Sequence, residues 1–199
     1  MAKGTRSWAT SSQTGARYPP RVPRDPITVL FVCTANICRS AYAEAAARHL
    51  AGSRTDVVFS SAGTHGYASQ PLNDEIAEFL PEGVAQDGFA SRRVTRDLVD
   101  RADLVLTAEA SHRTFLLEEY PHAFRKVLTL GQFAEAAGHS ELTGRELITA
   151  VGLRQPPPRP EHDVRDPYRR GRAVNARSAA QIEELLVTVV PALLDVDLG

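Results

Sequence analysis

The sequence predicts an α/β fold: a doubly wound, four-stranded parallel sheet with helices on both faces. Two observations predict this class. Short apolar stretches alternate along the chain with longer stretches of helical composition, which is the pattern of parallel strands joined by helical crossovers. The first apolar stretch, residues 27–32, is continuously hydrophobic, as expected for a strand that is buried on both faces.

The other elements follow from the same patterns, taken in order. The predicted strands are residues 27–32, 56–60, 103–106 and 126–130, and the predicted helices are residues 41–50, 71–80 and 109–119. A last helix is marked by apolar residues at a spacing of about 3.6, namely Ile182, Leu185, Leu186, Val189, Val190, Leu193 and Leu194. Pro191 lies among them, and we expect it to bend this helix.

The chain of 199 residues is expected to form one domain, residues 27–199, behind a flexible arm, residues 1–26. The arm is rich in Ser, Thr, Gly and Pro and has no apolar run, so it does not resemble a secretory signal. We interpret residues 138–161 as an insertion. It is expected to hold a helix near residues 141–151 and to end in a stiff, proline-rich loop.

Composition excludes several classes of protein. The formal net charge is -1 and 43% of the residues are hydrophobic, which argues against nucleic-acid and membrane partners. Both cysteines lie in one short loop, which is neither a disulfide scaffold nor a good zinc site. We therefore expect a cytoplasmic protein that needs neither a metal nor another cofactor.

The most informative segment is the loop that follows the first strand. It begins with Cys33 and reaches Arg39 after five intervening residues. Backbone N–H groups and a guanidinium that converge at a helix N-terminus can bind an oxyanion such as phosphate. The same groups stabilise a thiolate and make the cysteine a nucleophile. The predicted phosphate-binding residues are Thr34, Ala35, Asn36, Ile37, Cys38 and Arg39.

Three side chains near this loop have individual predictions. Asn36 tolerates the left-handed backbone conformation that a tight loop needs. Ser40 stands where a helix N-cap is expected, so its hydroxyl would contact either the Cys33 thiolate or a loop amide. Cys33 is predicted to be accessible and easily oxidised, and Cys38 is either a resolving thiol that forms a reversible disulfide or a packing residue.

A second informative segment is Asp166-Pro167-Tyr168. Proline keeps the preceding residue out of helix, so the Asp166 carboxyl is presented from extended backbone. Cleavage of a phosphate ester needs a proton donor for the leaving oxygen, and Asp166 is our candidate. Tyr168 is expected to stack on a flat substrate.

These residues resemble the low-molecular-weight protein tyrosine phosphatases, and the C-terminal motif is closest to bacterial members. The resemblance covers about residues 27–196 and includes Ser61-Ala62-Gly63-Thr64 and Ala102–Thr107 with His112-Arg113. It implies that Cys33 is the nucleophile, Arg39 the phosphate-binding arginine, Asp166 the general acid and Ser40 the partner of the thiolate. It also implies that Ser61 braces Asn36 and that Tyr67 forms a wall of the substrate cleft. Ala35 and Ala41 replace the usual glycine and proline of the family.

The predicted activity is hydrolysis of protein phosphotyrosine through a phosphocysteine intermediate. By resemblance, an autophosphorylated bacterial tyrosine kinase is a candidate substrate. Two alternatives remain at this level: an arsenate reductase of the same fold that uses an external thiol, and a non-catalytic phosphate-binding or redox-sensing module. The Asp-Pro-Tyr segment and the complete Cys, Arg and Asp set favour the phosphatase.

Overall fold

The computed structural model describes residues 25–66, 68–84 and 88–194. Most of the predicted arm and the cleft residue Tyr67 therefore lie outside the described residues. The strands are β1 (Ile27–Cys33), β2 (Val57–Gly63), β3 (Leu104–Thr107) and β4 (Val127–Thr129). The helices are α1 (Arg39–Ala51), α2 (Asp74–Ala77), α3 (Arg96–Arg101), α4 (Ala110–Glu119), α5 (Leu130–Gly138), α6 (Gly144–Arg154) and α7 (Arg172–Leu193), with short 3₁₀ turns at Pro121–Lys126 and Pro160–His162.

The four strands form one sheet in the order β2-β1-β3-β4, and every pair is parallel. This confirms the predicted fold class. The chain winds from β1 outward to β2 and then returns to β3 on the other side of β1. Ligands bind in such sheets beside the carboxyl ends of the strands where the winding reverses. The loop after β1 occupies that position.

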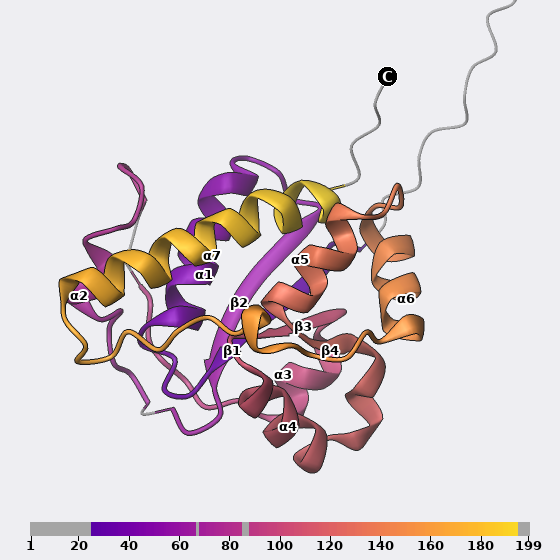
Figure 1. Ribbon diagram of the computed structural model, residues 1–199, viewed down its shortest axis with the longest axis horizontal. Coiled ribbons are helices and arrows are strands. Elements are labelled where there is room, and N and C mark those ends of the chain that lie inside the picture. The colour runs from indigo at the N-terminus through magenta and orange to yellow at the C-terminus, as the bar shows by residue number, and fades with distance from the viewer. Residues whose placement is uncertain (1–24, 67, 85–87, 195–199) are drawn as a thin grey trace, which may run out of the picture.

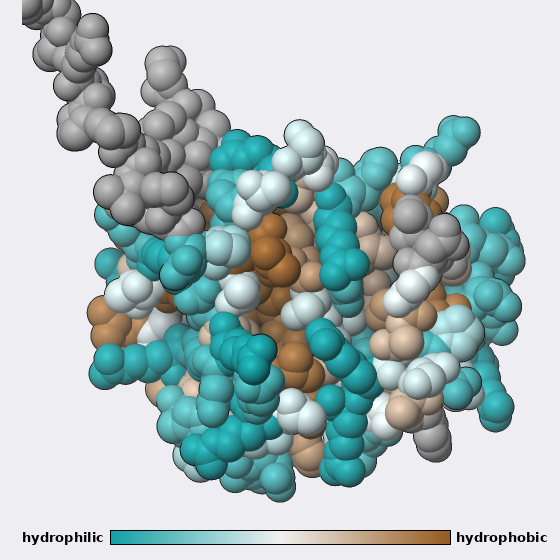
Figure 2. All heavy atoms as spheres, turned by 180° about the vertical axis from the view of Figure 1, so that it is seen from behind, coloured by the Kyte–Doolittle hydropathy of each residue, from teal (hydrophilic) through white to brown (hydrophobic). Residues whose placement is uncertain are grey.

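Helices cover both faces of the sheet, and two groups of buried side chains fill the spaces between them. One face packs against α1, α5 and α7, and the other against α3 and α4 (Figure 1). Val29 and Phe31 of β1 belong to the first group, whereas Leu30 and Val32 belong to the second. Successive side chains of a strand point to opposite faces of the sheet. Because both faces of β1 are buried, its apolar side chains form a continuous run over residues 29–32. The reverse side of the molecule is mainly hydrophilic, with apolar side chains near its middle (Figure 2).

Several predicted boundaries are wrong, for local reasons. The helix expected at residues 71–80 is only one turn, Asp74–Ala77, because the N–H groups of residues 79 and 80 bond to carbonyls three residues back, in tighter turns than an α-helix. The strand expected at residues 126–130 stops at Thr129, where a capping box with Gln132 begins α5, a helix that the sequence analysis missed. The sequence analysis also missed α3, which Thr95 caps.

Two helices in the C-terminal half have boundaries that differ from the predicted ones. The helix expected near residues 141–151 begins at Gly144 and reaches Arg154. The last helix begins at Arg172, well before its first predicted apolar residue, and Pro191 lies inside its final turn. Within the described residues, no helix is both long and apolar enough to cross a membrane.

Candidate active site

The loop from Cys33 to Arg39 joins the carboxyl end of β1 to the first residue of α1. Asn36 has a φ of 57°, the left-handed conformation expected for it, and Ala35 is not among the residues with positive φ. The alanine that replaces a glycine here is therefore not strained in that way. Within the described residues, the backbone N–H groups of residues 34–38 donate no hydrogen bond to the protein. They are free to bind an anion.

The carboxyl end of β2 holds this loop from one side. The N–H of Thr64 donates to the carbonyl of Cys33 (2.9 Å), and the N–H of His65 donates to the carbonyl of Thr34 (2.8 Å). A Cβ atom on Gly63 would lie 2.6 Å from the Thr34 carbonyl oxygen and 2.9 Å from the Asn36 nitrogen. Only glycine permits this approach without moving the backbone of the loop.

A chain of buried polar side chains leads from β2 to the Cys33 sulfur. The Asn36 amide nitrogen donates to the hydroxyls of Ser40 (3.0 Å) and Ser61 (2.8 Å). Ser61 donates in turn to Glu44 Oε2 at 2.5 Å, and the Ser40 oxygen lies 3.0 Å from Cys33 Sγ. Ser40 accepts from Asn36, and its own hydroxyl proton lies within reach of two acceptors, the Cys33 sulfur at 3.0 Å and the Ala62 carbonyl oxygen at 3.3 Å.

Two expectations about this loop need correction. Ser40 is not the N-cap of α1; that position belongs to Cys38, which makes no side-chain cap. Ser40 lies inside the first turn, and its hydroxyl faces the sulfur instead. Cys33, expected to be accessible, is only 2% exposed, because the loop and the sheet surround it.

Arg39 is 3% exposed and is held on two sides. Its Nη1 donates to the Glu109 carboxylate and to the Val164 carbonyl oxygen (3.0 Å). Its Nη2 lies 3.2 Å from Asp166 Oδ1. Among the described residues, nothing accepts a hydrogen bond from Arg39 Nε. The guanidinium is thus fixed beside the loop with one buried donor unused, which a phosphate oxygen would satisfy.

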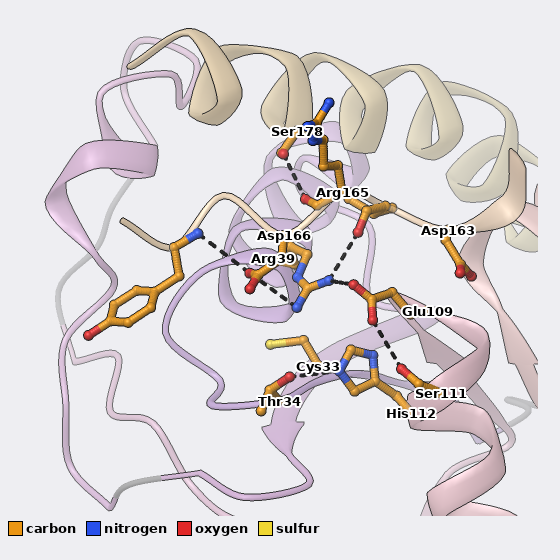
Figure 3. A network of polar contacts seen from close by, with 12 residues as sticks. Cys33, Thr34, Arg39, Glu109, Ser111, His112, Asp163, Arg165, Asp166 and Ser178 are labelled. Carbon is orange, nitrogen blue, oxygen red and sulfur yellow. Dashed lines mark hydrogen bonds and ion pairs between the residues drawn. The ribbon is translucent and has the colours of Figure 1, made fainter. Parts of the chain in front are cut away.

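The sequence analysis missed Glu109 and gave His112 no role, although both lie near Cys33 (Figure 3). Burial opposes ionisation of Glu109, but the Arg39 charge and the hydrogen bonds from Arg39 and Ser111 together hold the pKa of this carboxyl below its usual value. The His112 ring nitrogen Nε2 lies 2.8 Å from the hydroxyl of Thr34. Burial, and then the Arg39 charge, lower the pKa of His112 to about 4, so the imidazole is neutral at physiological pH.

A signal for both residues was present in the sequence. They directly follow β3, which pairs with β1, so they stand at the same carboxyl edge as Cys33. Polar residues that follow neighbouring parallel strands are brought together by the sheet.

The segment between Pro160 and Tyr168 places Asp166 beside Arg39, at the end of the Cys33 loop. The fold therefore brings together two predicted catalytic residues, Cys33 and Asp166, that lie far apart in the sequence. Asp163 Oδ1 accepts from the first N–H of α4, that of Ala110, at 2.8 Å. The Val164 N–H donates to the carbonyl of Ala108 (2.8 Å). The Asp166 side chain is 43% exposed, and its Oδ1 lies 3.5 Å from the Tyr168 nitrogen. Of the two aspartates on this segment, Asp166 therefore reaches both Arg39 and solvent, whereas Asp163 caps a helix.

Of the two remaining predicted site residues, Cys38 is buried and Tyr168 is exposed. Cys38 is a free thiol. Burial, and then the neighbouring charges of Cys33 and Asp166, raise its pKa to about 12. Tyr168 is 42% exposed, so its ring is available to a substrate. Among the described residues, no three Cys, His, Asp or Glu side chains cluster as metal ligands would.

Comparison with known families agrees with this geometry. Residues 28–144 match the model of the low molecular weight phosphotyrosine protein phosphatases. The chain belongs to this family. The matched residues contain the Cys33 loop, Ser61, Glu109 and His112 but end before Asp166, whose position beside Arg39 comes from the fold.

Relatives in the family carry two kinds of name. The chain is 34% identical over 109 residues to the low molecular weight protein-tyrosine-phosphatase Etp of Escherichia coli K12, covering 54% of this chain and 72% of Etp. It is 31% identical over 110 residues to a protein-arginine-phosphatase of Geobacillus stearothermophilus, covering 54% and 72%. The crystal structure of YfkJ from Bacillus subtilis superposes with a TM-score of 0.66 at 26% identity, covering 84% of this chain and 94% of YfkJ.

Proposed function

We propose that this protein hydrolyses phosphotyrosine in proteins and that Cys33 carries the phosphoryl group between the two halves of the reaction. The observation that supports this most is the convergence on one point of the Cys33 sulfur, the free N–H groups of residues 34–38, Arg39 and Asp166. A nucleophile, a set of anion donors and an acid are the groups that phosphoryl transfer through a covalent intermediate requires.

In the first step, the Cys33 thiolate attacks phosphorus, and the phosphorus–oxygen bond to the leaving group breaks. The loop N–H groups and Arg39 hold the three remaining oxygens and stabilise them as charge spreads in the transition state. Asp166 gives its proton to the departing phenolate. Tyr168 offers an aromatic surface to the ring of the substrate.

In the second step, a water molecule attacks the phosphocysteine. Asp166, now a carboxylate, accepts a proton from this water. The phosphorus–sulfur bond breaks, phosphate is released, and the thiolate returns to its contact with Ser40. Asn36 and Ser61 would keep the loop in one conformation throughout, since both are buried and hydrogen-bonded.

The substrate partner is a phosphoprotein, and we propose an autophosphorylated tyrosine kinase as one candidate, in keeping with the bacterial relatives. Because one relative is named a protein-arginine-phosphatase, phosphoarginine is the competing phosphoryl donor. The alternatives, arsenate reduction and a non-catalytic module, are less favoured, since the Escherichia coli and Geobacillus stearothermophilus relatives are both named phosphatases.

A substrate panel tests the proposal. Wild type and Cys33→Ser would be assayed with a phosphotyrosine peptide, a phosphoarginine peptide, and arsenate with a small thiol reductant. We expect wild type to prefer the phosphotyrosine peptide and Cys33→Ser to lose at least about 10³-fold in turnover. Preference for phosphoarginine, or reduction of arsenate, would overturn the proposed substrate. Retained turnover in Cys33→Ser would overturn the assignment of the nucleophile.

A further inference from the structure

Residues 165–172 contain four arginines and one aspartate, Asp166, although the whole chain has a formal net charge of -1. Arg165, Arg169 and Arg170 flank Asp166 and are all exposed. Within the described part of the chain, none of these three arginines has an ion-pair partner. Arg172 differs, because its guanidinium pairs with the carboxylate of Glu78, just after α2, and lies 4.9 Å from the centre of the Phe79 ring.

A defined turn presents two of these arginines next to the general-acid candidate. The Arg170 N–H donates to the Pro167 carbonyl at 3.1 Å and closes the turn. Arg169 has a φ of 55°, a left-handed conformation that is uncommon for a residue with a long side chain. Its guanidinium carbon lies 5.1 Å from the centre of the Tyr168 ring. The Arg169 side chain is therefore oriented by its backbone and by this cation–π contact.

The Arg169 guanidinium is suited to bind carboxylates. Its recorded contact with Tyr168 is a cation–π contact, which uses no N–H donor in a hydrogen bond to oxygen, so its planar fork can hold a carboxylate at two points. Arg170 adds a second exposed positive charge at the adjacent position. From Asp166 to Arg170 the chain spans at most about 14 Å, which is also the length of about four residues of extended peptide.

We propose that Arg169 and Arg170 bind acidic residues within about four positions of the phosphotyrosine, so that the protein substrates are acidic around the modified tyrosine. This inference rests on the proposed phosphotyrosine phosphatase function. It names a second contact for the peptide, beside the phosphate loop and on the same segment as Asp166.

Arg165 provides a matched control. It lies on the same segment and is exposed, but its side chain extends toward α7 and away from Cys33 (Figure 3). Neighbouring residues of extended backbone point to opposite sides, so the inward position of Asp166 turns Arg165 outward. Arg165→Gln removes the same charge without removing the proposed contact.

The test compares three phosphotyrosine peptides of equal length with acidic, neutral or basic flanks, and uses a small aryl phosphate as a baseline for each variant. For the double variant Arg169→Gln/Arg170→Gln, we expect the ratio of kcat/KM between acidic and neutral peptides to fall about tenfold at low salt, mostly through KM. High salt should weaken the wild-type preference. In Arg165→Gln the ratio should stay within about twofold of wild type.

Two results would overturn the inference: a wild type without preference for the acidic peptide, or a double variant that loses activity equally with all three peptides. Melting temperatures of both variants would be measured to identify a folding defect. A failure of the proposed function is distinguishable, because wild type would then turn over neither the aryl phosphate nor any of the peptides.

Discussion

Arg39 Nη2 lies 3.2 Å from Asp166 Oδ1, so the proposed phosphate-binding arginine and the proposed general acid are paired with each other. A phosphoryl group held by Arg39 would therefore lie beside Asp166, which is the arrangement that proton transfer to the leaving oxygen requires.

Asp166→Asn should impair the enzyme in proportion to the basicity of the leaving group. For phosphotyrosine, whose phenolate is a basic leaving group, we expect kcat to fall by about 10²-fold or more, because protonation of the leaving oxygen is lost. For an activated aryl phosphate the loss should be about tenfold or less. The measurement is kcat across a series of aryl phosphates.

Asp163→Asn is the matched control for that experiment. Asp163 accepts the Ala110 N–H at the start of α4, and an asparagine side chain can accept the same bond through its amide oxygen. Asp163→Asn should therefore change stability by less than about 1 kcal/mol and leave the leaving-group dependence unchanged. An effect of Asp166→Asn that is uniform across the series would contradict its role as the acid.

Glu109→Ala should lower kcat/KM by about tenfold, because Arg39 loses the carboxylate that fixes Nη1, and small errors in the position of a catalytic group are costly. Ser111→Ala is the control. The Ser111 hydroxyl donates to the other oxygen of Glu109 at 3.0 Å and is exposed, so kcat/KM should change by less than about twofold. Equal losses in the two variants would show that Glu109 does not position Arg39.

His112 should make the fold sensitive to acid. Burial, and then the Arg39 charge, lower its folded-state pKa to about 4, whereas the unfolded-state pKa is about 6.5. The unfolded chain thus binds the extra proton between these pH values, so stability falls as pH drops from about 6.5 to about 4, by about 3 kcal/mol in total. Above about pH 6.5 the imidazole is neutral in both the folded and the unfolded state, so it does not make stability depend on pH.

The measurement is urea unfolding of wild type and His112→Gln between pH 7 and pH 4. The variant should lose less stability on acidification than wild type. Parallel profiles for wild type and His112→Gln would contradict the neutral state of His112.

Cys38 should protect Cys33 after oxidation. Peroxide would convert the Cys33 thiolate to a sulfenic acid, and attack by Cys38 would release water and form a disulfide that dithiothreitol reduces. The raised pKa of Cys38, about 12, keeps it protonated at neutral pH and should make this closure slow. After brief peroxide treatment and reduction, Cys38→Ser should recover less activity than wild type. Equal recovery would leave Cys38 as a packing residue.

The sequence was sufficient to predict the sheet, because the continuous apolar run of β1 reflects burial on two faces. It was also sufficient to place Cys33, Arg39 and Asn36 in one loop, since their spacing is local. Helix boundaries were predicted less well. The start of α5 depends on the Thr129 capping box, whose effect was not weighed against the apolar pattern.

The contacts that orient Arg39 could not be predicted from local spacing in the sequence. Glu109 and the Val164 carbonyl lie 70 and 125 residues away from Arg39 along the chain, and their meeting depends on the packing of α4 and of the segment before Asp166. Side chains that follow adjacent parallel strands do carry a signal, and Glu109 and His112 could have been nominated from it.

The most direct test of the account is to identify the phosphorylated residue during turnover. Wild type would be mixed with an aryl phosphate, quenched in acid within the first turnovers, digested, and analysed by mass spectrometry. We predict one phosphoryl group on the peptide that contains Cys33, attached through sulfur, and none on the same peptide of Cys33→Ala. A phosphoryl group on another residue, or turnover by Cys33→Ala, would contradict the phosphocysteine mechanism.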